Sequence, residues 1–198
     1  MIDITVLIPT GTKHIDLVHG AHDGCLYAEP KIVYDCGLGK SKILNIHIQQ
    51  IKTKYIAFLD ADDWNLPNRF QDLSEDFDLL YSDCLEIFKN RSVKYCKSRD
   101  FNFEELKKKN YIPFSTAIVK TEIAKKLNFC SEIEGKDDWL YWLKFSLISK
   151  KIIYRPYPTV CRRMWTGYFT PSLNIYFIRK LIRIYQQRKV RRIIDENF

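Results

Sequence analysis

The sequence predicts an α/β fold with a mostly parallel sheet flanked by helices and a helical extension at the C-terminus. Two short apolar runs, Ile4–Ile8 and Tyr55–Leu59, each end in turn-forming or acidic residues, as buried strands do. Another strand is expected over Lys31–Tyr34, and apolar residues at helical spacing follow it between positions 43 and 51. Strand, helix, strand in this order is typical of βαβ units, and therefore of parallel pairing.

The elements after Leu59 follow from the same patterns. Pro67 predicts a helix beginning at Leu66–Phe70, because proline is accepted in the first helical turn. The remaining expected elements are, in order, a strand over Asp78–Asp83, a hairpin or loop over 86–99, a short charged helix over Phe103–Asn110, an extended segment Tyr111–Val119, a helix over Thr121–Leu127, a helix over Trp139–Ile148 and a strand over Ile152–Arg155.

The chain length of 198 residues suits one well-packed domain, which we assign to residues 1–165. No apolar run approaches the roughly 20 residues that span a bilayer. The N-terminus opens directly into a strand, without a basic region or cleavage site, so a cytoplasmic protein is expected. The six cysteines are scattered and form no Cys-x-x-Cys pair, which argues against a zinc site and against a disulfide framework.

The net charge of +8 is concentrated near the C-terminus, where Arg179–Arg192 holds seven Lys/Arg and no acid. Apolar residues on or near one face of the same segment predict a basic amphipathic helix over Leu173–Ile194, within an extension of residues 166–198. Such a helix suits a peripheral contact with a membrane. Packing on the domain with a solvated basic face, or a homodimer contact, is the alternative. No recognised motif supports nucleic-acid binding.

Three carboxylates, Asp60, Asp62 and Asp63, follow the Tyr55–Leu59 strand within four positions. The carboxyl ends of strands are where open α/β sheets bind their ligands. Adjacent carboxylates repel one another unless a cation lies among them. A hard divalent metal, Mg²⁺ or Mn²⁺, carrying a phosphorylated ligand is the simplest such cation. The alternative is an acidic, solvated turn.

A second acidic site, Asp137-Asp138, precedes the apolar helix that begins at Trp139. Helix capping accounts for one carboxylate at a helix N-terminus, but less well for two. Three histidines near the N-terminus, with two aspartates, match no tight metal-binding spacing, and a short helix and loop are the better interpretation there. These residues are His14, Asp16, His19, His22 and Asp23.

Two nucleotide sites are compatible with the strand ends. Gly39-Lys40-Ser41 lies between a strand and a helix, like the end of a P-loop, but Tyr34 stands where the first P-loop glycine belongs. The other arrangement places base and ribose contacts at Pro9-Thr10 and Asp35, and a diphosphate with its metal at Asp60–Asp63.

In the order of its parts, the chain resembles glycosyltransferases of the GT-A (Rossmann-like) fold and of the large inverting family 2. Tyr55–Asp63 is similar to the signature strand with its Asp-x-Asp motif, and Gly135–Trp139 is similar to the Glu-Asp-Trp motif. The matching pieces are Ile4–Thr10, Ile32–Asp35, Asn45, Tyr55–Trp64, Asp78–Asp83, Tyr111–Val119, Gly135–Leu143 and Val160–Arg163.

The resemblance implies a role for each matching residue. Pro9 and Thr10 would line the nucleoside site, and Asp35 would accept a hydrogen bond from the base, such as a uracil N–H. Asp60 and Asp62 would hold Mn²⁺ or Mg²⁺ on the diphosphate, with Asp63 nearby. Asp138 would be the general base, with Asp137 beside it.

The chain departs from the family pattern at several positions. Asp137 stands where the family usually has Glu, Met164 replaces a common histidine, and Leu44 replaces the usual Arg before Asn45. The loss of the histidine leaves Arg162 or Arg163 to neutralise the leaving group. Because Leu44 replaces the usual Arg, Lys40 or Lys42 would cover the phosphates instead.

These residues together predict an inverting, metal-dependent glycosyltransferase. The donor is expected to be a nucleotide sugar, with a UDP-sugar favoured, and the acceptor a hydroxyl of a glycan, a lipid-linked molecule or a protein. A sugar-phosphate nucleotidyltransferase is one alternative, but it would need a glycine-rich basic loop where only Gly11-Thr12-Lys13 stands. A non-catalytic nucleotide-sugar or glycan-binding module is another, and it would have no need of Asp137-Asp138.

Overall fold

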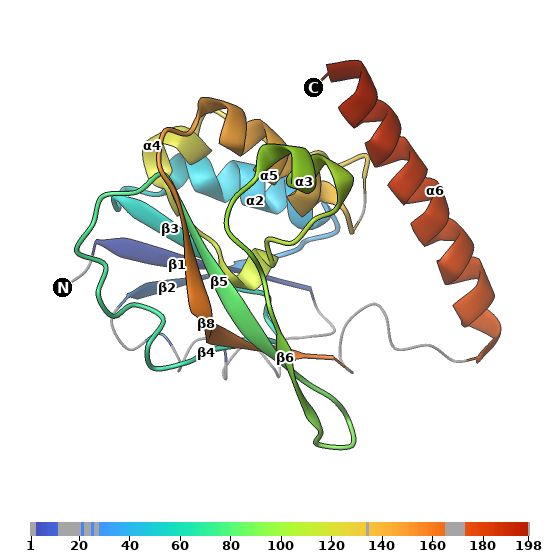
Figure 1. The fold of residues 1–198 in the computed structure, drawn as a ribbon, viewed down its shortest axis with the longest axis horizontal. Helices are drawn as coiled ribbons and strands as arrows, with labels where there is room; N and C mark the ends of the chain where they lie inside the picture. The colour runs from blue at the N-terminus through green and yellow to red at the C-terminus, as the bar shows by residue number, and fades with distance from the viewer. Residues whose placement is uncertain are drawn as a thin grey trace.

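The computed structural model describes residues 3–11, 21, 25, 28–133, 135–164 and 173–197. Within them an eight-stranded mixed sheet is covered by helices (Figure 1). The strands are β1 (Ile4–Thr10), β2 (Glu29–Tyr34), β3 (Tyr55–Phe58), β4 (Trp64–Asn65), β5 (Leu79–Ile87), β6 (Val93–Cys96), β7 (Ile118–Lys120) and β8 (Ile152–Arg163). The helices are α2 (Lys40–Gln50), α3 (Phe103–Lys108), the 3-10 turn η2 (Phe114–Thr116), α4 (Thr121–Ala124), α5 (Asp137–Ile148) and α6 (Leu173–Asn197).

The N-terminal half of the sheet is parallel, as predicted. β1 lies between β2 and β3 and pairs with both in parallel. All seven residues of β1 are buried, because both faces of the sheet are covered. Leu7 packs into the cluster beneath α2 and α5, whereas Val6 and Ile8 pack into a second cluster on the opposite face. The alternation of side chains along a strand accounts for this division.

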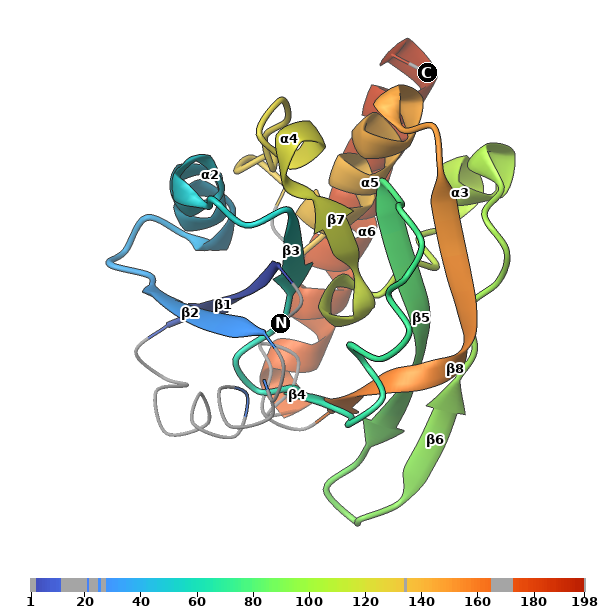
Figure 2. The same ribbon diagram turned by 90° about the vertical axis from the view of Figure 1, so that its left-hand side faces the viewer.

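The rest of the sheet is mixed: the predicted α/β fold is confirmed, but parallel pairing does not extend to every strand beyond β3. β7 runs antiparallel to both β3 and β5, and β8 is parallel to β5 but antiparallel to β4. Register shifts in the β5–β8 ladder at Ser82, Asp83 and Leu85 let the long strand β8 bend across to β4 (Figure 2). This bend brings the end of β8 beside the acidic turn that precedes β4.

The helix predicted to begin at Leu66–Phe70 does not form, and these residues make turns instead. The side chain of Arg69 accounts for the difference, because it points into the core rather than to solvent. Its guanidinium donates to the carbonyl of Phe58 at 2.7 Å, and it also donates to Asn65 Oδ1. A buried arginine that satisfies strand-end carbonyls fixes the chain locally more strongly than helix propensity does.

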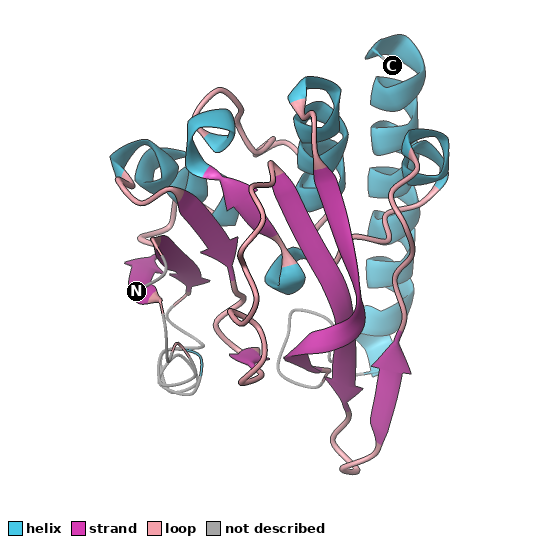
Figure 3. Cartoon of the chain, turned by 60° about the vertical axis from the view of Figure 1, so that its left-hand side comes forward, coloured by secondary structure: helices cyan, strands magenta, loops and turns pink. Residues whose placement is uncertain are grey.

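The long helices α2, α5 and α6 lie where the sequence predicts them, on one side of the curved sheet (Figure 3). Helix α6 contributes Val190 and Ile194 to the same hydrophobic cluster as α2 and α5. The predicted C-terminal extension therefore packs on the domain over its second half.

Candidate active site

The acidic turn lies at the carboxyl end of β3, as the sequence predicts. The Leu59 N–H donates to the Leu7 carbonyl at 3.2 Å, which continues the pairing with β1. The chain then turns through Asp60–Asp63, where the Asp63 N–H donates to the Asp60 carbonyl at 3.0 Å. β4 follows directly and pairs with β8. The turn is thus anchored to the sheet on both sides.

Asp63 differs from the other two carboxylates of the turn because it faces inward, with only 4% of its surface exposed. One oxygen accepts from the Ser115 hydroxyl at 2.6 Å, and the other accepts from the Arg163 N–H at 3.0 Å. Burial raises the pKa of Asp63 to about 7, and the Asp60 and Asp62 carboxylates push it in the same direction. The side chain of Asp63 therefore holds the turn in place.

Asp60 and Asp62 remain partly exposed. Asp60 forms an ion pair with Lys40, whose Nζ lies 2.5 Å from Oδ1. The same ammonium lies 3.6 Å from the centroid of the Phe114 ring, in cation–π geometry. The Asp60 N–H donates to Ser115 Oγ at 3.1 Å, so Ser115 connects both ends of the turn.

The second acidic site is the first turn of α5. Asp137 accepts from the Ser41 hydroxyl at 2.8 Å. Asp138 accepts from the Trp139 N–H at 2.8 Å and from the Asn110 side-chain amide at 3.0 Å. Burial raises the pKa of Asp138 to about 6, and the Asp137 carboxylate adds to the effect. The Trp139 contact is a helix-end hydrogen bond, so capping explains part of this arrangement but not the bond from Asn110.

Consecutive residues at the start of α2 connect the two acidic sites. Lys40 contacts Asp60, and Ser41 contacts Asp137. Burial lowers the pKa of Lys40, but the nearby carboxylates of Asp60 and Asp137 outweigh that effect, so the ammonium stays charged. The structure therefore brings together two motifs that are far apart in the sequence, with one cation between them.

The residues predicted to contact the nucleoside occupy neighbouring strand ends. Pro9 and Thr10 end β1, and the Asp35 N–H donates to the Thr10 carbonyl at 2.8 Å. The Asp35 carboxylate accepts from the Gly39 N–H at 2.8 Å, which closes the turn before α2. Gly39 has φ +85, a backbone conformation that side chains other than glycine rarely adopt.

Asn45 lies on α2, one to two turns from Lys40, and its amide is engaged elsewhere. Its Nδ2 donates to the Phe129 carbonyl at 3.0 Å, and its Oδ1 accepts from the Phe129 N–H at 2.7 Å. The structure therefore assigns Asn45 to holding the segment before α5, and does not bring its amide to the acidic turn.

The two arginines at the end of β8 flank the acidic turn. Arg162 Nε lies 3.9 Å from an Asp63 oxygen, and its Nη1 lies 3.4 Å from Glu86. The Arg163 guanidinium stacks 5.3 Å from the centroid of the Trp64 ring. Both side chains are partly exposed, so they present positive charge beside the turn.

The three aspartates of the turn differ in what they could offer to a metal. Among the described residues, no three His, Cys, Asp or Glu side chains gather as potential metal ligands, and both oxygens of Asp63 already accept hydrogen bonds. Asp60 and Asp62 still offer the hard oxygen ligands that Mg²⁺ and Mn²⁺ take together with substrate phosphates. The histidine group near the N-terminus lies outside the described residues.

Ser115, Arg69 and Asn110 support the site, but the sequence gives no sign of their roles. Each contacts a partner that is distant in sequence or in an irregular segment: Ser115 contacts Asp63, and Asn110 contacts Asp138. Arg69 follows Pro67-Asn68, which suggests a helix start. Only its deep burial shows that it supports the carbonyl end of β3.

Comparisons with known proteins agree with this architecture. Residues 31–120 match the model of glycosyl transferase family 2. An uncharacterised glycosyltransferase of Methanocaldococcus jannaschii is 32% identical over 119 residues, which are 54% of this chain and 40% of that protein. The chain thus spans less than half the length of this curated relative.

Solved glycosyltransferases share the fold at low sequence identity. S. aureus TarS 1-349 in complex with UDP-GlcNAc aligns at a TM-score of 0.66 and 15% identity, over 92% of this chain and 66% of that one. The mannosyltransferase PcManGT from Pyrobaculum calidifontis, in complex with GDP-Man and Mn²⁺, aligns at 0.54 and 14% identity, over 91% and 60% of the two chains. The fold is therefore that of GT-A glycosyltransferases.

The contacts of Ser115 generate a prediction about stability. Ser115→Ala removes a donor to the buried Asp63 carboxylate and an acceptor for the Asp60 N–H, so the free energy of unfolding should fall by about 1–3 kcal/mol. Urea denaturation measures this change. Ser146→Ala is the matched control, because the Ser146 hydroxyl contacts only a carbonyl of its own helix. Equal losses for the two variants would contradict a special role for Ser115.

Proposed function

We propose that this chain, a family 2-like glycosyltransferase of the GT-A fold, transfers a sugar from a nucleotide-sugar donor to an acceptor hydroxyl with inversion at the anomeric carbon. The supporting observation is the convergence of the Asp60–Asp63 turn and the Asp137-Asp138 pair on the start of α2. One acidic group suits the leaving diphosphate and the other suits the attacking hydroxyl. The solved structures with UDP-GlcNAc and with GDP-Man support a nucleotide-sugar donor, and we favour a UDP-sugar.

Residues at the ends of β1, β2 and β3 would bind the nucleotide-sugar donor. Pro9, Thr10 and Asp35 would contact the nucleoside, and Asp60 with Asp62 would hold Mn²⁺ or Mg²⁺. The metal would stabilise the charge of the departing diphosphate as a Lewis acid. Arg162, Arg163 and Lys40 lie around the same turn, where their positive charges would further stabilise that leaving group.

Asp138 would act as the general base toward the acceptor hydroxyl. As the acceptor oxygen attacks the anomeric carbon, its proton passes to the Asp138 carboxylate, and the bond to the diphosphate breaks. A pKa of about 6 leaves this carboxylate ionised at neutral pH, yet more basic than an ordinary aspartate. Asn110 and the Trp139 N–H fix its orientation. A single base and one direct displacement invert the anomeric centre.

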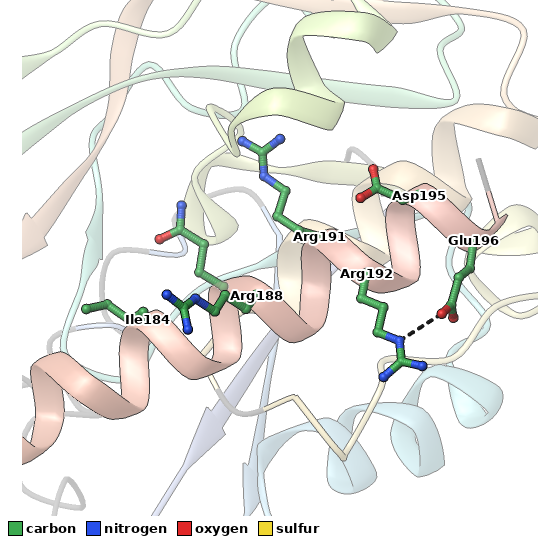
Figure 4. Close-up of a pocket in the computed structure, with 7 residues that line it drawn as sticks. Ile184, Arg188, Arg191, Arg192, Asp195 and Glu196 are labelled. Atoms are coloured by element: carbon green, nitrogen blue, oxygen red, sulfur yellow. Dashed lines mark hydrogen bonds and ion pairs between the residues drawn. The ribbon is translucent and has the colours of Figure 1, made fainter.

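The acceptor is a hydroxyl of a glycan, a lipid-linked molecule or a protein, and α6 favours one found at a membrane. None of the described helices combines the length and apolarity that would let it cross a bilayer. Helix α6, however, lines a groove of about 630 Å³ in which Ile184 and Arg188 lie near the Arg192–Glu196 ion pair (Figure 4). Tyr185 beside it is 65% exposed. We place this basic and apolar face against anionic headgroups at the cytoplasmic side of a membrane.

Substitution of the base should separate chemistry from binding. Asp138→Asn should lower the rate of transfer by about 10²–10⁴-fold, while nucleotide binding in calorimetric titrations stays within a factor of two to three. Asp62→Ala should instead weaken metal-dependent nucleotide binding, because it removes a proposed metal ligand. Near-normal turnover by Asp138→Asn would refute the assignment of the base.

The pH dependence should report the same carboxylate. Because burial raises the pKa of Asp138 to about 6 and that of Asp63 to about 7, kcat/KM should fall as the pH drops through about 7 to 6, where first Asp63 and then the base become protonated. An unperturbed aspartate would lose activity only near pH 4. Asn110→Ala removes a donor that favours the charged form, so it should move this limb to higher pH.

Membrane contact should depend on the charge of α6. Arg188→Gln with Arg192→Gln should weaken flotation with vesicles containing anionic lipid, by several-fold for each charge removed. Lys52→Gln with Lys126→Gln removes equal charge at exposed positions outside α6 and is the matched control. Equal flotation of the two double variants would exclude this face of α6 as the membrane-binding surface. A change in sedimentation instead would indicate a homodimer contact there.

A further inference from the structure

Lys40 occupies a position that the metal would also need. Its ammonium contacts Asp60 Oδ1 at 2.5 Å, and the Asp60 side chain is partly exposed, whereas Asp63 in the same turn is buried with both oxygens accepting hydrogen bonds. The Phe114 ring, 3.6 Å from the ammonium, supports it from the other side. Lys40 is therefore the counter-ion that the protein itself supplies to Asp60.

An ammonium and a divalent cation cannot both neutralise the same carboxylate without repelling each other. A metal that binds Asp60 alone must displace Lys40, which then loses its ion pair in a half-buried position. The diphosphate of the donor changes this balance, because its anionic oxygens give the displaced ammonium a new partner. The four-carbon stem of lysine allows such a shift. The carboxylates of Asp137 and Asp138 act on Lys40 from the far side of the site and keep it close.

We propose that Lys40 is a built-in counter-ion that makes the metal bind well only together with the nucleotide diphosphate. This inference rests on the proposed function, since it concerns the same donor site. By linkage, the diphosphate must raise metal affinity by the same factor as the metal raises diphosphate affinity. Lys40 thus sets the order of assembly, in addition to any contact that it makes with the leaving group.

The test is titration of Mn²⁺ alone, followed by the loss of the free-ion electron paramagnetic resonance signal, and then with saturating UDP or GDP. Lys40→Met should bind Mn²⁺ alone about five- to tenfold more tightly than wild type, because the competing charge is gone. Lys40→Arg keeps the charge and should stay as weak as wild type. Lys52→Met removes equal charge at an exposed position two residues beyond the C-terminal end of α2 and should also leave the affinity unchanged. Thermal unfolding confirms that each variant is folded.

In wild type the nucleotide should tighten Mn²⁺ binding by more than it does in Lys40→Met. Equal Mn²⁺ affinity of wild type and Lys40→Met, or an equal gain with Lys52→Met, would overturn the inference, even if the protein transfers sugar normally. The proposed function fails in a different way, by the absence of transfer from any nucleotide sugar. A selective gain in Lys40→Met would still stand in that case.

Discussion

The buried carboxylate of Asp63 is the interaction on which the candidate site depends. It joins three elements that are far apart in the sequence: the acidic turn itself, η2 through the Ser115 hydroxyl, and the end of β8 through the Arg163 N–H. An ionisable group is costly to bury unless donors surround it, and here two donors and the nearby Arg162 supply that compensation. Because Asp63 is fixed, Asp60 and Asp62 project from a rigid base. Rigid placement of charged groups is what electrostatic stabilisation of a leaving group requires.

A second constraint is that like charges must be kept apart or compensated. Asp60, Asp62, Asp137 and Asp138 converge on one region, and Lys40 lies between the two sets. The protein divides these carboxylates by environment. Asp60 is ion-paired, Asp137 accepts from a hydroxyl, and Asp138 is buried with a raised pKa. Pairs of acids whose environments separate their pKa values are typical of sites with distinct acid–base roles.

The sequence was informative wherever a pattern is local. The apolar runs of β1 and β3, the acidic residues after β3 and the helix after Asp138 follow from neighbouring residues, and the structure confirms those elements. The antiparallel entry of β7 was not predictable, because a strand of three residues carries no direction in its sequence. The segment Leu66–Phe70 resembles a helix start because it is led by a proline, and the carbonyls that hold Arg69, those of Phe58 and Ala117, lie in distant parts of the sequence. For the same reason, the sequence could not tell that Asp63 faces inward while Asp62 stays partly exposed.

The C-terminal helix shows why net charge alone is a poor guide to partners. Two of its described basic residues are occupied in docking: Lys189 pairs with Glu132, and Arg191 donates to the Lys108 carbonyl and lies 5.8 Å from the centroid of the Trp139 ring. Trp139 follows Asp138 directly, so α6 supports the helix that carries the proposed base. Arg192 is paired with Glu196 at 2.8 Å, so Arg188 is the cation beside this pair that an anionic partner would meet. A surface contact along α6 would therefore bring the acceptor side of the enzyme close to that partner without a separate linker between the two.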